Sequence, residues 1–192
     1  NNYIMLIIAI IIILIIGCIT KKQRRINKSP KLFYSTNEFP ITKILEDNWE
    51  LIANECMKLP KDVMINKEGR LQSSWYGDND FKKLAELHQK KYGWINGWQT
   101  NQNKKNNNWL NWGLYFDRKP LGYNSKLCPV TTNILSKIPG IQVAGFSIMK
   151  PDSMINPHTD RTGLKFNSIA YHLGLDVPND GDCKLFIGDN YM

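Results

Sequence analysis

The pattern of apolar and polar residues divides the chain into three parts. Residues 3–19 are uncharged and almost wholly apolar, with Ile and Leu dominant. At a helical rise of about 1.5 Å per residue this run just crosses the hydrocarbon core of a bilayer, so it predicts a transmembrane helix within residues 1–20. A basic linker follows at residues 21–31. Residues 32–192 have the mixed pattern and the length of one globular domain.

The first half of this domain has helical periodicity. Over residues 41–59 the spacing of apolar residues predicts one helix with a single buried stripe, closed by Pro60. Residues 131–138 predict a second, shorter helix that ends before Pro139 and Gly140. The polar segment 101–108 (NQNKKNNN) is expected to be a solvent-exposed loop. The stripe consists of Ile41, Ile44, Leu45, Trp49, Ile52, Cys56 and Leu59.

The second half has shorter apolar runs with strand character. Residues 143–149, 168–177 and 183–187 are β-prone and are separated by Pro, Gly, Asp and Asn. Helices therefore come first along the chain and strands later. This order predicts an α+β domain in which a helical layer packs on a β-sandwich or barrel.

Positive charge is concentrated next to the apolar run. Six of the chain's net eight positive charges lie in residues 21–31, which leaves about +2 for residues 32–192. A nucleic-acid-binding domain needs a basic face on its folded part, so the charge disfavours that class and favours contact with anionic membrane lipid. We expect a single-pass membrane protein with its domain on the cytoplasmic side.

Two other interpretations of the N-terminal run stay open. A cleaved signal peptide has an apolar core of this kind, and residues 15–18 (IIGC) have the form of a lipidation box ending in Cys18. Both require a basic region before the apolar run, and the sequence has none there. An uncleaved anchor is therefore the favoured interpretation.

The tripeptide His158-Thr159-Asp160 is the clearest candidate for metal chemistry. On an extended backbone the side chains of His158 and Asp160 leave from the same face, because they are two residues apart. An imidazole and a carboxylate held in this way fit adjacent positions on Fe(II), and a second His completes the facial triad of non-haem iron enzymes. Without further context the tripeptide also fits a surface turn in which Asp160 caps the backbone.

The surrounding segments supply that context. They are 45–49 (LEDNW), 128–131 (CPVT), 138–140 (IPG), 146–151 (FSIMKP), 157–158 (PH) and 172–175 (HLGL). In these segments, and over nearly all of residues 32–192, the chain resembles the aspartyl/asparaginyl β-hydroxylase family of Fe(II)/2-oxoglutarate dioxygenases. The resemblance implies a partial double-stranded β-helix (jelly-roll) core behind the helical layer. It also implies Fe(II), 2-oxoglutarate and O2 as cofactor and co-substrates.

The resemblance implies roles for four residues. His158 is the iron-binding His, and Asp160 is a second metal ligand. Ser147 helps to bind a carboxylate of 2-oxoglutarate, and His172 contacts the same co-substrate. Many protein-modifying members have Gly where this chain has Asp160. Asp160 is similar to the lipid A acyl-chain hydroxylases of the family, which also have an N-terminal anchor.

Two departures from the family pattern concern the co-substrate. The family usually has Arg two residues before the second His, where this chain has Ala170, so a cation that would pair with a carboxylate is missing. The interval between His158 and His172 is also longer than usual. Arg161 or Lys165 in this interval is a candidate replacement, although loop cations are usually only solvated.

The distal iron-binding His and the 2-oxoglutarate-binding Arg of the family would follow residue 192. We therefore expect this stretch to belong to a longer protein and to be inactive alone. Of the three histidines, His88 lies in a helical context and is expected to be structural or on the surface. A triad of His158, Asp160 and His172 is a less favoured alternative.

Four tryptophans, Trp94, Trp98, Trp109 and Trp112, either line an apolar substrate groove or pack the helical layer, and packing is favoured. The function expected is a membrane-anchored dioxygenase that hydroxylates an Asp- or Asn-type side chain of a protein. Hydroxylation of a lipid acyl chain is the first alternative, favoured by Asp160 and the anchor. A membrane-tethered binding module without turnover is the second, suggested by Ala170 and the missing distal ligands.

Overall fold

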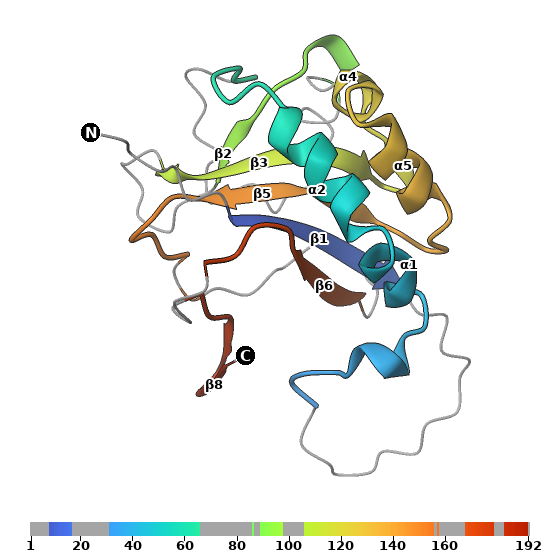
Figure 1. Ribbon diagram of the computed structural model, residues 1–192, viewed down its shortest axis with the longest axis vertical. Coiled ribbons are helices and arrows are strands. Elements are labelled where there is room, and N and C mark those ends of the chain that lie inside the picture. Colours follow the sequence, from blue (N-terminus) through green and yellow to red (C-terminus); the bar gives the residue numbers. More distant parts are fainter. Residues whose placement is uncertain are drawn as a thin grey trace.

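The computed structural model describes residues 8–16, 31–65, 86, 89–97, 106–155, 157, 168–178 and 183–191 of the 192-residue chain. Helices pack on an antiparallel sheet, so the expected α+β class is confirmed (Figure 1). Six strands form the main sheet in the order β2-β3-β5-β1-β6, with β4 beside β3, and β7 and β8 form a separate hairpin. The closed double-stranded β-helix remains a prediction.

The bounds of the elements are as follows. The main sheet contains β1 (Ile8–Ile16), β2 (Ile95–Gly97), β3 (Asn106–Phe116), β4 (Lys119–Pro120), β5 (Val143–Met149) and β6 (Ser168–Gly174). The hairpin contains β7 (Phe186–Ile187) and β8 (Asn190–Tyr191). The described helices are η1 (Thr36–Glu38), α1 (Thr42–Glu46), α2 (Trp49–Lys58), α4 (Gly122–Lys126) and α5 (Pro129–Ser136).

Strand β1 corrects the expected transmembrane helix. It lies between β5 and β6 and pairs antiparallel with both, through four residue pairs with β5 and seven with β6. Seven of its nine residues are Ile, whose β-branched side chain favours extended backbone. In the described part of the chain no helix is long and apolar enough to cross a membrane.

The helix predicted over residues 41–59 is two helices, α1 and α2. The chain turns between them, and the Asn48 side chain donates a hydrogen bond to the Ile44 carbonyl at 2.7 Å. The buried stripe is mostly confirmed, but Trp49 is 45 % exposed because the turn moves it out of the expected phase. The buried members of the predicted stripe are Leu45, Ile52, Cys56 and Leu59.

The second predicted helix is confirmed as α5, which starts two residues earlier than expected. Pro129 occupies its first turn, where the missing N–H costs nothing. The Glu55 carboxylate of α2 accepts hydrogen bonds from the backbone N–H groups of Val130 and Thr131, at 2.9 and 2.7 Å. These bonds satisfy donors that a helix start leaves without partners, and they fasten α5 to α2.

The strand predictions are confirmed in part. β5 has the predicted bounds, β6 ends three residues early, and only the last two residues of the third run form a strand. The long strand β3 was missed because it begins in the Asn-rich segment that suggested a loop. Its second half alternates in the way a strand should, since Trp112 and Leu114 are completely buried.

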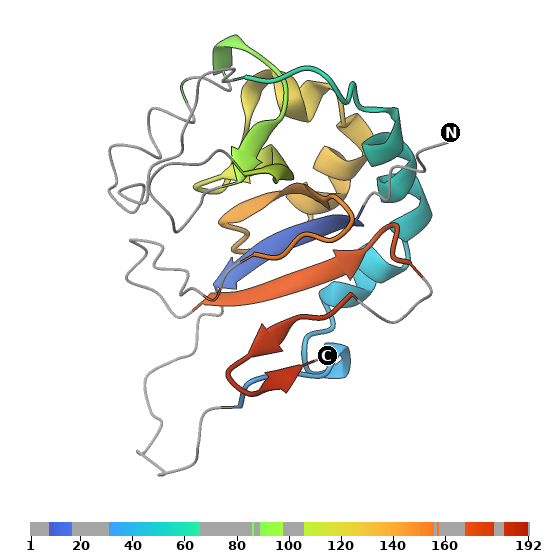
Figure 2. The same cartoon turned by 90° about the vertical axis from the view of Figure 1, so that its left-hand side faces the viewer.

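The helices cover one face of the main sheet, as Figures 1 and 2 show. The core lies between α2, α5 and the inner sides of β3 and β5, with Leu173 of β6 at its margin. Phe146 and Ile148 of β5 point into it, and Trp112 of β3 is among its largest buried side chains. The opposite face is therefore available for polar residues.

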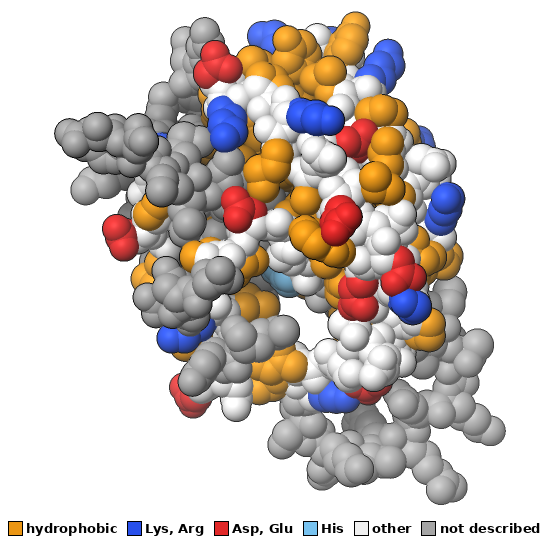
Figure 3. All heavy atoms as spheres, in the orientation of Figure 1, with side chains coloured by type: hydrophobic (Ala, Val, Ile, Leu, Met, Phe, Trp, Pro, Cys, Tyr) orange, Lys and Arg blue, Asp and Glu red, His pale blue; other side chains and the backbone are white. Residues whose placement is uncertain are grey.

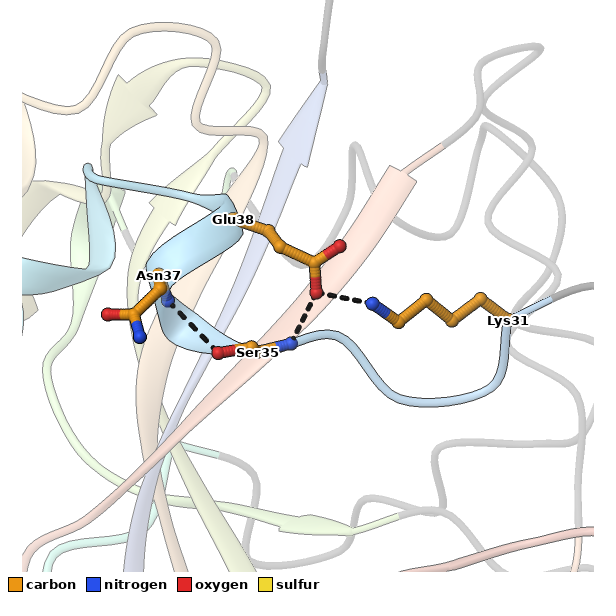
Figure 4. A network of polar contacts seen from close by, with 4 residues as sticks. All are labelled: Lys31, Ser35, Asn37 and Glu38. Atoms are coloured by element: carbon orange, nitrogen blue, oxygen red, sulfur yellow. Dashed lines mark hydrogen bonds and ion pairs between the residues drawn. The ribbon is translucent and has the colours of Figure 1, made fainter.

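A short network fixes the chain where the described domain begins (Figure 4). Ser35 accepts a hydrogen bond from the Asn37 N–H, and Glu38 accepts one from the Ser35 N–H, which makes a capping box at η1. Lys31 donates to the same Glu38 carboxylate. The hydrogen bond from Lys31 is the main reason that the pKa of Glu38 lies below its ordinary value. All of these groups are exposed, so the network orients the chain more than it stabilises it.

Candidate active site

The site face is defined here as the side of the main sheet turned away from the helices. Successive residues of a strand alternate between faces, so Ser147 lies opposite its core neighbours Phe146 and Ile148. The same alternation places His172 on the site face, because Tyr171 and Leu173 pack on the helix side. The structure thus puts both residues expected to bind 2-oxoglutarate on one face.

Ser147 is buried on this face and has a specific partner. Its Oγ accepts a hydrogen bond from the Nε1–H of Trp109 on β3, with a donor–acceptor distance of 2.6 Å. Ser147 is 3 % exposed and Trp109 is 5 % exposed. The register of β3 and β5 pairs Trp109 with Met149 and Asn111 with Ser147, so the two bonded side chains are diagonal neighbours on one face.

His172 lies on the other side of β1 from Ser147. Ile10 of β1 pairs with Ser147 on one side and with Gly174 on the other, whereas Ile12 pairs with His172. Two inter-strand spacings and a two-residue offset separate Ser147 and His172, about 10 Å across the strands and about 7 Å along them. A ligand that contacts both side chains must therefore extend over β1.

Strand β6 is held against the helical layer beneath His172. The Tyr171 hydroxyl donates a hydrogen bond to the Glu46 carboxylate of α1 at 3.1 Å. Burial, and secondarily the negative charge of Glu46, raises the pKa of Tyr171 above its ordinary value, so the phenol remains protonated and keeps its role as donor. This contact links β6 to α1 on the face opposite His172.

The predicted iron ligands His158 and Asp160 lie outside the described residues, and so do the candidate cations Arg161 and Lys165. In the described ranges no three His, Cys, Asp or Glu side chains gather as a metal site would require. Ala170 is described, and it is exposed on β6 two residues before His172. The departure from the family's Arg therefore falls on the site face.

The tryptophans divide between the two faces of the sheet. Trp94 and Trp112 pack edge to face in the core, with ring centroids 5.3 Å apart. Their indole N–H groups donate to backbone carbonyls, of Pro60 and Asn124 respectively. Packing, the favoured interpretation, is confirmed for these two. Trp98 lies outside the described residues, as does the third histidine, His88.

Trp109 lies on the site face, although packing in the helical layer was the favoured interpretation for it. It is three residues from Trp112, and an odd spacing on a strand puts two side chains on opposite faces. The signal was therefore present in the sequence. It was hidden because β3 was not recognised as a strand.

The buried cysteines do not form a second site. Cys56 and Cys128 are both thiols within the core. Burial raises the pKa of Cys56 to about 12 and also raises the pKa of Cys128. Because the thiolate is the reactive form, neither is a nucleophile at neutral pH.

Comparison with known families places the chain in one of them. The sequence profile of the aspartyl/asparaginyl beta-hydroxylase family matches residues 46–192. The chain belongs to this family. No curated protein and no solved structure matches it significantly.

The matched residues include every strand of the main sheet except β1. They also include the helices α4 and α5. Membership in the aspartyl/asparaginyl beta-hydroxylase family identifies the chain, at a coarse level, with 2-oxoglutarate-dependent hydroxylases. Among the residues that the structure describes, Ser147 and His172 are the ones expected to contact 2-oxoglutarate. The family match begins at residue 46, so β1 and η1 lie outside it.

Proposed function

We propose that this protein is an Fe(II)- and 2-oxoglutarate-dependent dioxygenase that hydroxylates an Asp, Asn or similar side chain of a protein. Family membership supports the class of reaction. The observation that supports the site is the buried Ser147 hydroxyl, which Trp109 holds on the face of the sheet away from the helices. Because the Ser147 hydroxyl accepts from Trp109, its proton can be donated to an acceptor such as a carboxylate oxygen.

The donor groups of the chain fit both the metal and the co-substrate. His158 and Asp160 offer a nitrogen and a carboxylate oxygen, a set that suits Fe(II) when a further His is added. Ser147 and His172 offer donors to carboxylate oxygens. When bound, iron and 2-oxoglutarate would supply the oxidising chemistry, in which 2-oxoglutarate loses CO2 and O2 gives one atom to succinate and one to a substrate C–H bond. The chain's own contribution is to bind and orient the co-substrate and to exclude water around Ser147.

The direct test is succinate formation that depends on Fe(II) and 2-oxoglutarate, measured on the full-length protein. His158→Ala and Asp160→Ala should each lower turnover at least about a hundredfold, because a ligand of the metal is lost. His88→Ala is the matched control and should retain turnover, since it removes a His outside the proposed site. Equal turnover in wild type and His158→Ala would contradict the assignment of this site.

Asp160 supports a second candidate, hydroxylation of a lipid acyl chain. The carboxylate at this position is similar to the lipid A hydroxylases, whereas many protein-modifying members have Gly there. The two candidates differ in which substrate increases succinate formation. Stimulation by Asp- or Asn-containing peptides supports the first, and stimulation by acylated lipid supports the second.

Ala170 motivates a third outcome, a binding module without turnover. Ala170, where the family usually has Arg, lies on the site face two residues before His172. If the full-length protein forms no succinate with either class of substrate but still binds one of them, the binding module is the correct interpretation.

A further inference from the structure

The Trp109–Ser147 contact differs in kind from the other indole contacts of the core. Trp94 and Trp112 donate to backbone carbonyls, which belong to the fold itself. Trp109 donates to a side-chain hydroxyl, at 2.6 Å and at a buried position. Of the three buried tryptophans that the structure describes, Trp109 is the one whose N–H reaches a residue of the candidate site.

The chemistry of the two groups decides which direction the hydrogen bond takes. An indole N–H only donates, whereas a hydroxyl has one proton to donate and two lone pairs that accept. The bond from Trp109 therefore occupies a lone pair of Ser147 Oγ and leaves the hydroxyl proton for another acceptor. A serine held in this state donates in a fixed direction, and an anionic oxygen is the acceptor it suits best.

We propose that Trp109 is a positioning residue, which orients the Ser147 hydroxyl as a donor to a carboxylate of 2-oxoglutarate. This inference depends on the proposed function and adds a residue to it. Ala170 stands where a cation is usual, so that cation does not assist carboxylate binding on the site face.

The strand register makes this positioning rigid. Trp109 pairs with Met149 and Asn111 with Ser147, in the part of the antiparallel ladder between β3 and β5 that precedes the register shift at Gly113–Tyr115. A shift of one residue would move Trp109 to the helix side of the sheet and break the contact. The bond is also out of water, where it is stronger than a similar bond at the surface.

The test measures KM for 2-oxoglutarate and kcat in the full-length protein. Trp109→Phe keeps an aromatic ring and removes the N–H, so KM should rise about tenfold while kcat at saturating 2-oxoglutarate changes little. Ser147→Ala should raise KM at least as much. The double variant should be no worse than Ser147→Ala, because Trp109 acts through Ser147. Additive effects, or an unchanged KM in Trp109→Phe, would overturn the inference and leave the proposed function intact.

Trp112→Phe is the matched control. It removes another buried N–H from the same strand, but on the helix side, where the partner is the Asn124 carbonyl. We expect it to lower the melting temperature without raising KM. If Trp112→Phe raises KM as much as Trp109→Phe, the effect is structural and the inference is wrong.

A measurement on the wild type covers the case in which Trp109→Phe does not fold. In protein labelled with ¹⁵N at tryptophan and loaded with Zn²⁺, the Trp109 indole resonance should move when 2-oxoglutarate is added. The Trp112 resonance should stay in place. A stationary Trp109 signal in a protein that binds 2-oxoglutarate overturns the positioning role. Absence of 2-oxoglutarate binding overturns the proposed function together with it.

Discussion

Adjacent residues of β5 have different roles because a strand sends successive side chains to opposite faces. Phe146 and Ile148 fill the core beneath the helices, while Ser147 between them reaches the site face. The same rule separates Trp109 from Trp112 on β3. The function of each side chain thus depends on its position within the strand as much as on its chemical type.

Gly145 shows how closely β3 and β5 approach. A Cβ built at this position would lie 2.5 Å from the Trp112 carbonyl oxygen and 3.1 Å from the Gly113 Cα, both of them backbone atoms that cannot move aside independently. The position therefore requires glycine. It also lies two residues from Ser147, so the close approach supports the register on which the Trp109–Ser147 bond depends.

Gly145→Ala should lower the free energy of unfolding by about 1–3 kcal/mol, as expected when a tightly packed region is overfilled. Denaturant unfolding followed by tryptophan fluorescence measures the change. Gly174→Ala is the control, because its Cβ would meet one methyl of the exposed Val177 side chain and no backbone atom. A loss as large in Gly174→Ala as in Gly145→Ala would show that the close backbone contact is not the cause.

At the scale of elements, β1 has the largest consequence for the site. It is the shared partner of the strands that carry Ser147 and His172, which do not pair with each other. Its residues set both the distance and the offset between these two side chains. The N-terminal run is therefore part of the frame of the candidate site.

Deletion of residues 1–20 distinguishes this strand from a membrane anchor. If β1 is part of the sheet, the deletion removes the hydrogen-bonding partner of β5 and β6, and the remaining domain should lose cooperative thermal unfolding. Deletion of residues 1–7 only, which ends before β1, is the control and should keep the transition. A domain that unfolds cooperatively without residues 1–20 would show that its fold does not need β1.

At the scale of the whole molecule, the basic segment 21–31 and the domain that follows it differ in net charge. On the face seen in Figure 3, Lys and Arg side chains are interspersed with Asp and Glu and form no patch of one sign. The domain as a whole carries about +2, whereas residues 21–31 carry six positive charges and no acidic residue. We propose that this basic segment binds anionic lipid headgroups and brings the domain to a membrane surface.

Vesicle co-sedimentation measures this binding. The full-length protein should bind vesicles with phosphatidylserine more tightly than neutral vesicles, by about 1 kcal/mol per basic residue near the surface, and the difference should shrink as salt is added. A variant with Gln at the six basic positions of residues 21–31 should lose the preference. The control variant replaces Lys126 and Lys137 of the domain, both exposed, and should keep it. A preference that survives the first variant would assign lipid binding to another part of the protein.

The sequence predicted those features that depend on local spacing. Apolar periodicity located the buried residues Leu45, Ile52 and Cys56, and the β-prone run 143–149 gave β5 its observed bounds. The segments around Ser147 and His172 also identified the family that the profile match confirms. These predictions succeeded because a helix or strand places its side chains by short-range geometry.

Two features were decided only by the tertiary structure. The composition of the Ile-rich run 8–16 is compatible with a helix in lipid and with a strand in a sheet. Its pairing with β5 and β6 shows that it forms the strand. Trp109 could have packed anywhere until the register of β3 and β5 placed its N–H on Ser147, 38 residues away. The sequence by itself thus predicted which residues are candidates for the chemistry. The long-range strand pairing determined which of them meet, because that pairing is fixed by the whole sheet and not by any one segment.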